Sequence, residues 1–379
     1  MHLDKPKTER TPAYQSEAAK SHLKQNKATR CRAASLGTIL QDPPASSCKS
    51  KGRPSPGCEK VTSSLIDRAL DSRSLALVAL GKFLQRQNYR FITTTPATHA
   101  RVLARQTPSE AENLTDIFGW SRFFRRDRFP DVAEMLFYAG ELEANSDLVR
   151  SKVRFSTLGD QLYVHSAYPT DSPDAVFFGP DTYRFVRIIK HFLPKGNHRP
   201  TRIIDLGCGT GAGGIYAASL VSGVKPQLMM VDVNEKALRY TRVNCAINGA
   251  QACTAVQSDL FDALDANADL IISNPPYLVD PMARAYRHGG PSGFDLSHRI
   301  AAESLSHLNR GGRMILYTGT PVVDGTDLFL TSLSKSFSTE AQSFLYEEVD
   351  PDVFGEELET PNYSHVDRIA AVSVIADLK

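Results

Sequence analysis

The stretch that decides the fold is Asp205-Leu206-Gly207-Cys208-Gly209-Thr210-Gly211. It follows an apolar run, Arg202 to Leu206, that predicts a buried strand, and it precedes Gly214 to Ser222, which predicts a helix. Glycines let the backbone turn sharply and come close to a ligand, while the start of the next helix presents free N–H groups. We therefore expect a strand–loop–helix unit that binds a nucleotide-like ligand.

Strands and helices alternate from residue 201 onward. The expected strands are Arg202 to Leu206, Gln227 to Val233, Cys253 to Gln257, Asp269 to Ser273, Arg313 to Thr318, Gln342 to Glu348 and Ile369 to Ile375. The expected helices are Gly214 to Ser222, Glu235 to Asn248 and His298 to Leu308. Such alternation indicates βαβ crossovers and a mostly parallel sheet covered by helices, which is the α/β class.

The part of the chain before this sheet has a different pattern. Residues 63–150 follow the helical period, and we expect helices within 65–84, at Thr98 to Ala104, Ser109 to Phe118 and Pro130 to Leu142. Residues 151–179 alternate with a period of two around Gly159-Asp160, which predicts a β-hairpin. Asp181 or Thr182 is expected to cap the following helix, Tyr183 to Phe192. We thus divide the chain into a tail (1–62), a helical N-terminal domain (63–150), a linking hairpin (151–179) and a Rossmann-like domain (180–379).

The tail differs in charge from the rest of the 379-residue chain. Residues 1–60 contain twelve Lys or Arg and five Asp or Glu, a net charge of +7, whereas the remaining residues carry −5. With few large apolar residues, residues 1–62 cannot offset their ordering entropy, so we expect disorder. The segment is interpreted as a solubilising tail, with a nucleic-acid or ribosome contact and an organelle-targeting segment as alternatives.

Composition narrows the setting in which the protein works. No apolar run approaches the roughly 18 residues of a membrane span, so we predict no membrane partner. None of the six cysteines forms a Cys-x-x-Cys pair, and no secretory signal opens the chain. We expect free thiols in a reducing compartment, the cytoplasm, and no metal site. Oligomeric state has no signature in the sequence.

Two further acids predict which cofactor the glycine loop binds. Asp232 ends the second strand 25 positions after Gly207, where an acid can accept hydrogen bonds from ribose hydroxyls. Asp259 follows the third strand, where it can accept from an adenine amine while Leu260 covers the ring. The loop pattern G-x-G-x-G, preceded by Asp205, suits the ammonium group of S-adenosylmethionine. An alternative reading, Gly209-x-Gly211-x-x-Gly214, matches the G-x-G-x-x-G pattern of dinucleotide-binding loops, so NAD remains an alternative cofactor.

The strongest chemical signal is Asn274-Pro275-Pro276-Tyr277, which follows the apolar run Ile271-Ile272-Ser273. The two prolines restrict the loop, and the carboxyl end of such a strand is where α/β sheets bind ligands. The Asn274 side-chain oxygen and the Pro275 carbonyl can accept the two N–H groups of an amide or exocyclic amine, and Tyr277 can stack on its planar group. This arrangement predicts methyl transfer to a planar nitrogen, with Asn274 lying beside the cofactor as well.

These motifs, in this order, resemble the class I S-adenosylmethionine-dependent methyltransferases of the small-domain type, and in particular the release-factor glutamine N-methyltransferases. The resemblance covers roughly residues 150–320, and more loosely 63–150. It rests on Asn-Pro-Pro-Tyr at 274–277, on Gly289-Gly290-Pro291-Ser292-Gly293-Phe294-Asp295 and on Gly311-Gly312-Arg313. It implies a Rossmann-like sheet of seven strands, a helical N-terminal domain, a linking hairpin and a release-factor-like protein substrate.

Three features depart from that family. Gly179 stands where a Pro-Arg-Pro-Glu-Thr-type motif has arginine, Tyr317-Thr318-Gly319 replaces Glu-x-Gly, and residues 346–357 form an acidic insertion. The methyl acceptor is therefore open. A protein glutamine is the first hypothesis and an RNA or DNA amine is the second, followed by a small molecule. A non-catalytic nucleotide-fold module and a dehydrogenase are the remaining alternatives. The acidic body disfavours a large phosphate-binding surface, whereas the basic tail favours one.

Deleting residues 1–60 is expected to leave the melting temperature of the protein nearly unchanged, because little apolar surface is lost with them. Calorimetry of the truncated and full-length chains checks this expectation. A drop of many degrees would mean that the tail packs on the folded body.

Overall fold

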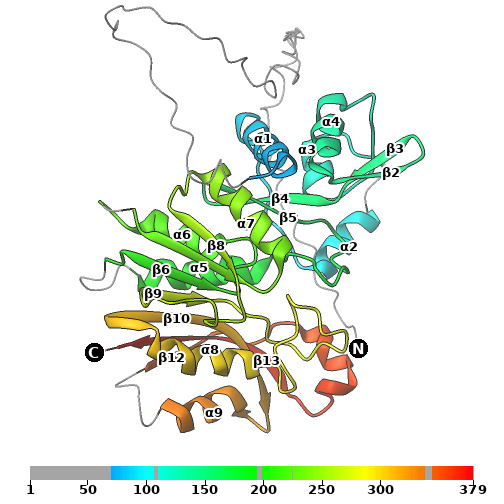
Figure 1. The fold of residues 1–379 in the computed structure, drawn as a ribbon. Coiled ribbons are helices and arrows are strands. Elements are labelled where there is room, and N and C mark those ends of the chain that lie inside the picture. The colour runs from blue at the N-terminus through cyan, green and yellow to red at the C-terminus, as the bar shows by residue number, and fades with distance from the viewer. Residues whose placement is uncertain (1–69, 106–109, 194–198, 224, 338–343, 379) are drawn as a thin grey trace, which may run out of the picture. The chain divides into compact units, whose positions relative to one another are not determined.

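The C-terminal part of the chain folds around a twisted sheet with the strand order β12-β13-β10-β9-β6-β7-β8 (Figure 1). The computed structural model describes residues 70–105, 110–193, 199–223, 225–337 and 344–378. The strands are β6 (Arg202–Leu206), β7 (Gln227–Asp232), β8 (Cys253–Gln257), β9 (Ala268–Ser273), β10 (Leu308–Val323), β12 (Phe344–Asp350) and β13 (Arg368–Asp377), and the short β11 (Thr326–Asp327) pairs with β10. Neighbouring strands from β10 to β8 run parallel, while β13 is antiparallel to both β10 and β12. The predicted seven-stranded α/β sheet is confirmed.

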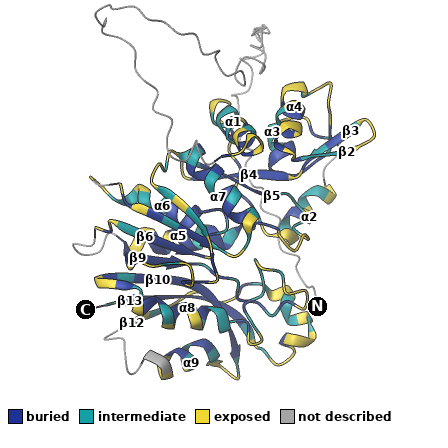
Figure 2. Ribbon diagram, in the orientation of Figure 1, coloured by how far each residue is buried: buried dark blue, intermediate teal, exposed yellow. Residues whose placement is uncertain are grey.

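Helices cover both faces of this sheet. They are α5 (Pro180–Phe192), α6 (Ala212–Leu220), α7 (Glu235–Asn248), α8 (Asp295–Ser306) and α9 (Leu328–Phe337). Successive strand residues face opposite sides, so that Ile203 packs in the hydrophobic cluster with α5, α6 and α7, and Ile204 packs in the cluster with α8 and α9. The central strands are accordingly buried along most of their length, whereas the edge strands β8 and β12 are partly exposed (Figure 2).

The N-terminal region contains a small sheet that the sequence analysis did not predict. Its helices are α1 (Ser72–Arg86), α2 (Pro96–Arg105), α3 (Leu114–Phe118) and α4 (Pro130–Ala139), and its strands are β1 (Phe124–Arg125), β2 (Leu142–Asn145) and β3 (Leu148–Ser151). The helix expected at Pro130 to Leu142 ends early because Gly140 adopts a left-handed conformation, with φ of 73°, and caps α4. Leu142 therefore begins a strand instead of ending the helix.

The predicted hairpin forms from β4 (Val153–Leu158) and β5 (Gln161–Ser166) and binds to α7 through asparagine side chains. The Asn244 side chain accepts from the Val164 N–H at 2.8 Å and donates to the Val164 carbonyl at 3.1 Å. Its amide also donates to the carbonyl of Thr210, in the glycine loop, at 2.9 Å. One buried side chain thus joins the hairpin, α7 and the loop after β6.

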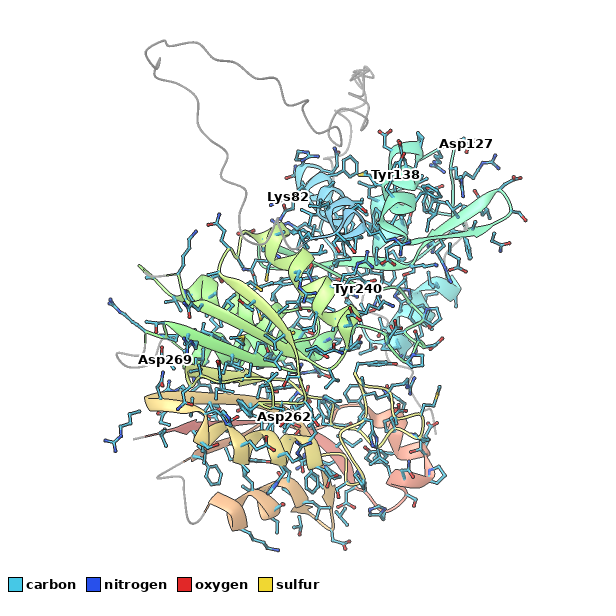
Figure 3. All side chains as sticks on the ribbon, in the orientation of Figure 1. Lys82, Asp127, Tyr138, Tyr240, Asp262 and Asp269 are labelled. Carbon is cyan, nitrogen blue, oxygen red and sulfur yellow. The ribbon has the colours of Figure 1, made fainter. Side chains whose placement is uncertain are left out.

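Helix α1 packs closely on α7, at its C-terminal turn. A Cβ atom at Gly81 would lie 2.4 Å from the Ile247 side chain, so the helices approach where α1 has no side chain. Tyr240, labelled in Figure 3, is buried, and its hydroxyl donates to Glu141 at 3.2 Å. Arg239 donates to the same carboxylate at 3.0 Å. These contacts hold the end of α4 against the sheet domain.

The domain boundaries at 62, 150 and 179 stay predictions. The tail lies outside the described residues, and so do Leu65, Ile66 and Ala69 of the first expected helix.

Two short 3₁₀ helices, η3 (Gly355–Glu359) and η4 (Pro361–Tyr363), lie between β12 and β13. None of the described helices is long and apolar enough to cross a membrane.

Replacing Asn244 by alanine is expected to lower the free energy of unfolding by about 2–4 kcal/mol, because several buried backbone groups lose their hydrogen-bond partner. Urea unfolding of the purified protein measures the change. Asn145→Ala is the matched control, since Asn145 is exposed at the end of β2 and should change stability little. Equal effects of the two substitutions would contradict a bridging role for Asn244.

Candidate active site

The glycine loop lies where the sequence predicts it, between β6 and α6. Gly207, Gly209 and Gly211 have φ values of 62°, 53° and 74°, a region that side chains with a Cβ rarely adopt. The Cys208 N–H donates to the Val231 carbonyl at 2.9 Å, which holds the loop against the end of β7. Gly211 is the N-cap residue of α6. The loop backbone therefore faces the carboxyl edge of the sheet.

Asp232 ends β7 and is bound to the loop directly. Its carboxylate accepts from the Gly209 N–H and from the Asn234 N–H, each at 2.8 Å. Burial raises the pKa of Asp232 above its ordinary value. Each carboxylate oxygen has a second lone pair, so both remain able to accept a ligand hydroxyl.

Asp205 is more deeply buried and faces the first turns of α6. Its carboxylate accepts from the Gly214 N–H at 2.7 Å. Burial raises the pKa of Asp205 to about 8, so that its carboxyl group is protonated at neutral pH in the protein alone. A cationic ligand group beside it would lower this pKa again.

Asp259 and Leu260, the two residues predicted to bind adenine, differ in their exposure to solvent. The Asp259 side chain is 58% exposed and lies 3.7 Å from the Arg299 guanidinium. Leu260 is buried and has a φ of 49°, which is rare for a residue with a branched side chain. A backbone held in this region commonly occurs at ligand sites.

The Asn-Pro-Pro-Tyr stretch follows β9 at the same edge of the sheet. Asn274 is half-buried, and none of the described residues forms a hydrogen bond with its carboxamide. Pro275 and Pro276 have no backbone N–H, so each contributes only a carbonyl acceptor to this turn. Tyr277 is buried, its ring lies against Gly319, and its hydroxyl donates to Asp181 at 2.8 Å.

The role of Asp181 could not be read from the sequence. The predicted cap is only partly found, because the Thr182 hydroxyl accepts from the Gly179 N–H at 3.3 Å while Asp181 turns into the core. There it accepts from the hydroxyls of Tyr277 and Tyr317, both at 2.8 Å. Burial raises the pKa of Asp181 despite these donors. Tyr317 is the first residue of Tyr317-Thr318-Gly319, the stretch that departs from the family's Glu-x-Gly. That departure was the only feature of the sequence that pointed to this contact.

One pocket brings nearly all the predicted residues together. It is lined by every residue expected at the site except Gly211, that is by Asp205, Gly207, Gly209, Asp232, Asp259, Leu260, Asn274, Pro275, Pro276 and Tyr277. Sequence reasoning did not predict other residues that line it, among them Phe177, Tyr286, Arg287 and Phe354. Its acidic and basic lining residues are four aspartates and a single arginine. Such a lining suits a cofactor that carries an ammonium and a sulfonium charge.

Comparison with known proteins finds a family match for the domain that supplies most of this pocket. Residues 187–340 match the family model described as "Methyltransferase small domain". These residues are thus similar to a methyltransferase small domain. The predicted enzyme class, a methyltransferase that uses S-adenosylmethionine, is thereby confirmed for this domain.

Relatives of the methyltransferase domain act on different acceptors, as their names state. The chain is 33% identical over 162 residues to a release factor glutamine methyltransferase of Rhodopirellula baltica, covering 38% of this chain and 54% of the relative. It is 31% identical over 141 residues to a ribosomal RNA small subunit methyltransferase C of Actinobacillus pleuropneumoniae, covering 37% and 39%. It is 30% identical over 132 residues to a ribosomal protein uL3 glutamine methyltransferase of Francisella tularensis, covering 31% and 41%.

These matches cover about half or less of each relative, so they describe the methyltransferase domain and not whole proteins. Among solved structures, a SAM-dependent methyltransferase from Agrobacterium tumefaciens is 13% identical with a TM-score of 0.42, covering 62% of this chain and 72% of that chain. This similarity is too low to support an inference about activity. Among the described residues, no group of three or more His, Cys, Asp or Glu side chains could hold a metal ion.

Asp232→Ala is expected to weaken S-adenosylmethionine binding by roughly 1.5–3 kcal/mol, the scale of hydrogen bonds to a charged group. Titration calorimetry on the folded variant measures the affinity. Asp265→Ala serves as the control, because Asp265 is exposed and does not line the pocket. Unchanged affinity in Asp232→Ala would remove Asp232 from the cofactor site.

The raised pKa of Asp205 predicts a dependence of stability on pH. Between about pH 4 and 8 the unfolded chain has lost this proton while the folded protein keeps it, so stability falls as pH rises. The limiting slope is about 1.4 kcal/mol per pH unit. Asp205→Asn should lose this contribution, because asparagine mimics the protonated acid. Urea unfolding of both proteins from pH 4 to 8 tests this, and parallel curves would contradict it.

Proposed function

We propose that this chain is an S-adenosylmethionine-dependent N-methyltransferase whose acceptor is the side-chain amide of a glutamine in a release-factor-like protein. The observation that carries the proposal is the Asn274 carboxamide. It lines the cofactor pocket at the end of β9, and no described residue hydrogen-bonds it. A half-buried amide of this kind is available to a ligand.

Chemically, the Asn274 side-chain oxygen and the Pro275 carbonyl would accept the two N–H groups of the acceptor amide. The bound cofactor supplies a methyl group on a positively charged sulfur. As the acceptor nitrogen forms its bond to that methyl group, the sulfur keeps the electron pair of the broken bond, and the nitrogen gains positive charge before losing a proton to water. The two acceptors interact more strongly with that charged nitrogen than with the neutral amide, which is how they would lower the barrier.

Pocket charge favours a neutral acceptor over a nucleotide. Arg287 is the only cation among the lining residues, and its guanidinium pairs with Glu357 and lies 4.0 Å from Asp280. A phosphate would have to displace these carboxylates and enter a pocket whose other ionisable lining residues are acidic, which is unfavourable. A glutamine side chain carries no charge. Two of the relatives named above are glutamine methyltransferases, which also supports the proposal.

A nucleic-acid amine is the second candidate, because the ribosomal RNA methyltransferase relative matches the chain at similar identity. We place either activity in a reducing compartment such as the cytoplasm, since the described cysteines Cys208, Cys245 and Cys253 are free thiols. The absence of a metal requirement stays part of the proposal.

The acceptor class is tested by incubating the full-length enzyme and tritiated S-adenosylmethionine with a cell lysate, followed by protease or nuclease digestion. The proposal expects labelled macromolecule that protease destroys and nuclease does not. Acid hydrolysis, which cleaves side-chain amides, should then release the label as methylamine. Label that only nuclease removes would favour the second candidate and overturn the glutamine assignment.

On the labelled acceptor, Asn274→Ala is expected to lower kcat on the order of 10²–10³-fold while cofactor affinity changes little, because a preorganised polar contact is lost mainly in the transition state. Asn274→Asp should keep partial activity, since a carboxylate still accepts a hydrogen bond. Single-turnover kinetics and calorimetry separate the two effects. If Asn274→Ala turns over at the wild-type rate, the tetrapeptide is only a structural turn.

A further inference from the structure

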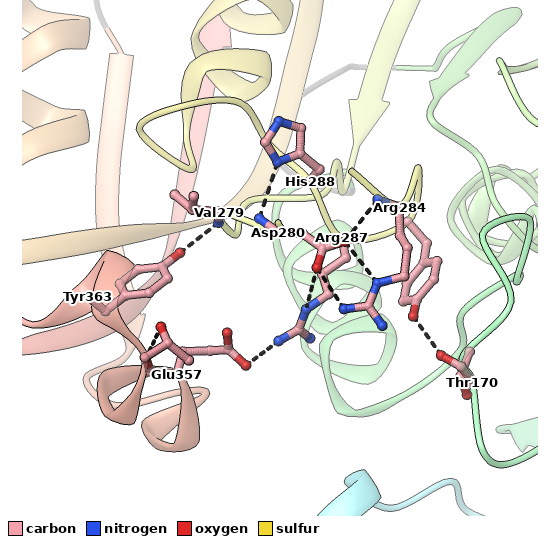
Figure 4. A network of polar contacts seen from close by, with 10 residues as sticks. Thr170, Val279, Asp280, Arg284, Arg287, His288, Glu357 and Tyr363 are labelled. Carbon is pink, nitrogen blue, oxygen red and sulfur yellow. Dashed lines mark hydrogen bonds and ion pairs between the residues drawn. The ribbon is translucent and has the colours of Figure 1, made fainter. Parts of the chain in front are cut away.

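The segment between β12 and β13, residues 351–367, lies against the loop that follows the Asn-Pro-Pro-Tyr stretch. The Tyr363 hydroxyl accepts from the Val279 N–H at 2.9 Å, and Glu357 forms an ion pair with Arg287 (Figure 4). The segment lies C-terminal to residues 187–340, which match the methyltransferase small domain. Part of the pocket is therefore built by residues outside the matched domain.

The loop that receives these contacts, residues 278–288, is itself braced. Arg284 donates two hydrogen bonds to Asp280, at 2.7 and 2.8 Å, and these bonds lower the pKa of Asp280 to about 2. The Tyr286 hydroxyl donates to the Thr170 carbonyl at 2.6 Å, on the stretch between the hairpin and α5. Residues 351–367 contact this loop on one side and Thr170 contacts it on the other, so the loop is fixed in position beside the pocket.

Phe354 extends from this segment into the pocket. It lines the same cavity as Asn274, and its ring centroid lies 5.8 Å from that of Tyr277, with the ring planes at 72°. Its φ of 55° is unusual for a residue with a Cβ. The neighbouring Val353 is buried, and its N–H donates to the Ile369 carbonyl at 2.8 Å, which anchors the backbone just before the strained position.

Tyr277 is less available to an acceptor than the sequence suggested. Its ring lies within 2.2 Å of where a Cβ of Gly319 would be, its hydroxyl is bound to Asp181, and its side chain is buried. Phe354 is only half-buried and packs on the same ring. The aromatic surface beside Asn274 that is open to a ligand therefore includes Phe354.

We propose that residues 351–367 form the acceptor-side wall of the pocket, and that Phe354 is a specificity-determining residue that packs on the acceptor's aliphatic stem. This inference rests on the proposed function. A glutamine side chain has two methylene groups before its amide. These groups would lie on the Phe354 ring while the amide reaches Asn274, and the Glu357–Arg287 ion pair would keep the wall in place. An asparagine acceptor, one methylene shorter, would make less contact with the ring.

The test uses the full-length enzyme, the acceptor protein found by the labelling experiment, and a form of that protein with asparagine in place of the methylated glutamine. Phe354→Leu and Phe354→Gly should each raise the acceptor KM about tenfold, the scale of a lost aromatic contact. They should also narrow the preference for glutamine over asparagine, with cofactor affinity within about twofold of wild type. Phe354→Tyr should restore wild-type values. Glycine accepts the positive φ, so its variant separates loss of the ring from backbone strain.

The ion pair is tested by Glu357→Gln, with Glu359→Gln as the matched control, because Glu359 is exposed on the same segment. Glu357→Gln should raise the acceptor KM severalfold, and Glu359→Gln should not. A purely structural role for Phe354 would lower kcat and stability without changing the glutamine-to-asparagine preference, and that result would overturn the inference. So would wild-type kinetics in both Phe354→Leu and Phe354→Gly. If the wild-type enzyme labels no glutamine, the proposed function itself fails, and this is seen before any Phe354 variant is made.

Discussion

The buried carboxylate of Asp181 is the interaction on which the geometry of the pocket depends. Asp181 lies in the first turn of α5, accepts from Tyr277 after β9, and accepts from Tyr317 within β10, so that three separate segments meet at one side chain. Arg184 extends the connection, because it pairs with Asp181 at 3.1 Å and with Asp350, at the end of β12, at 2.8 Å. A buried carboxylate is costly unless it is well hydrogen-bonded, which restricts these segments to arrangements that supply its donors.

Charge in the pocket is arranged in two layers. The carboxylates of Asp205 and Asp232 lie behind the glycine loop, and both have raised pKa values because they are buried. Toward the proposed acceptor, the single cation Arg287 is paired with carboxylates. This distribution favours a positively charged cofactor beside an uncharged acceptor, and it joins the cofactor prediction to the proposed glutamine substrate through one electrostatic argument.

The proposed acceptor wall also explains how related domains could differ in substrate. The match to the methyltransferase small domain ends at residue 340, whereas Phe354, Glu357 and Tyr363 come later in the chain. Cofactor contacts lie in the matched part, and the wall lies in the connection between the last two strands. A connection between strands can vary more readily than the strands themselves, because it lies outside the sheet's hydrogen-bonding pattern.

By itself the sequence determined the sheet, most of its strand and helix positions and the residues of the cofactor loop, because these depend on local periodicity and on turn chemistry. The strand Arg202–Leu206 and the helix Glu235–Asn248 were predicted to the residue. It did not predict β1, β2 and β3, whose two to four residues are too short to establish a period. Only the tertiary structure decided that Asp181 turns inward instead of capping α5, and that Phe354 reaches Tyr277 across 77 positions of sequence. Such contacts arise from packing between segments that are distant in the sequence, so the pattern of neighbouring residues does not predict them.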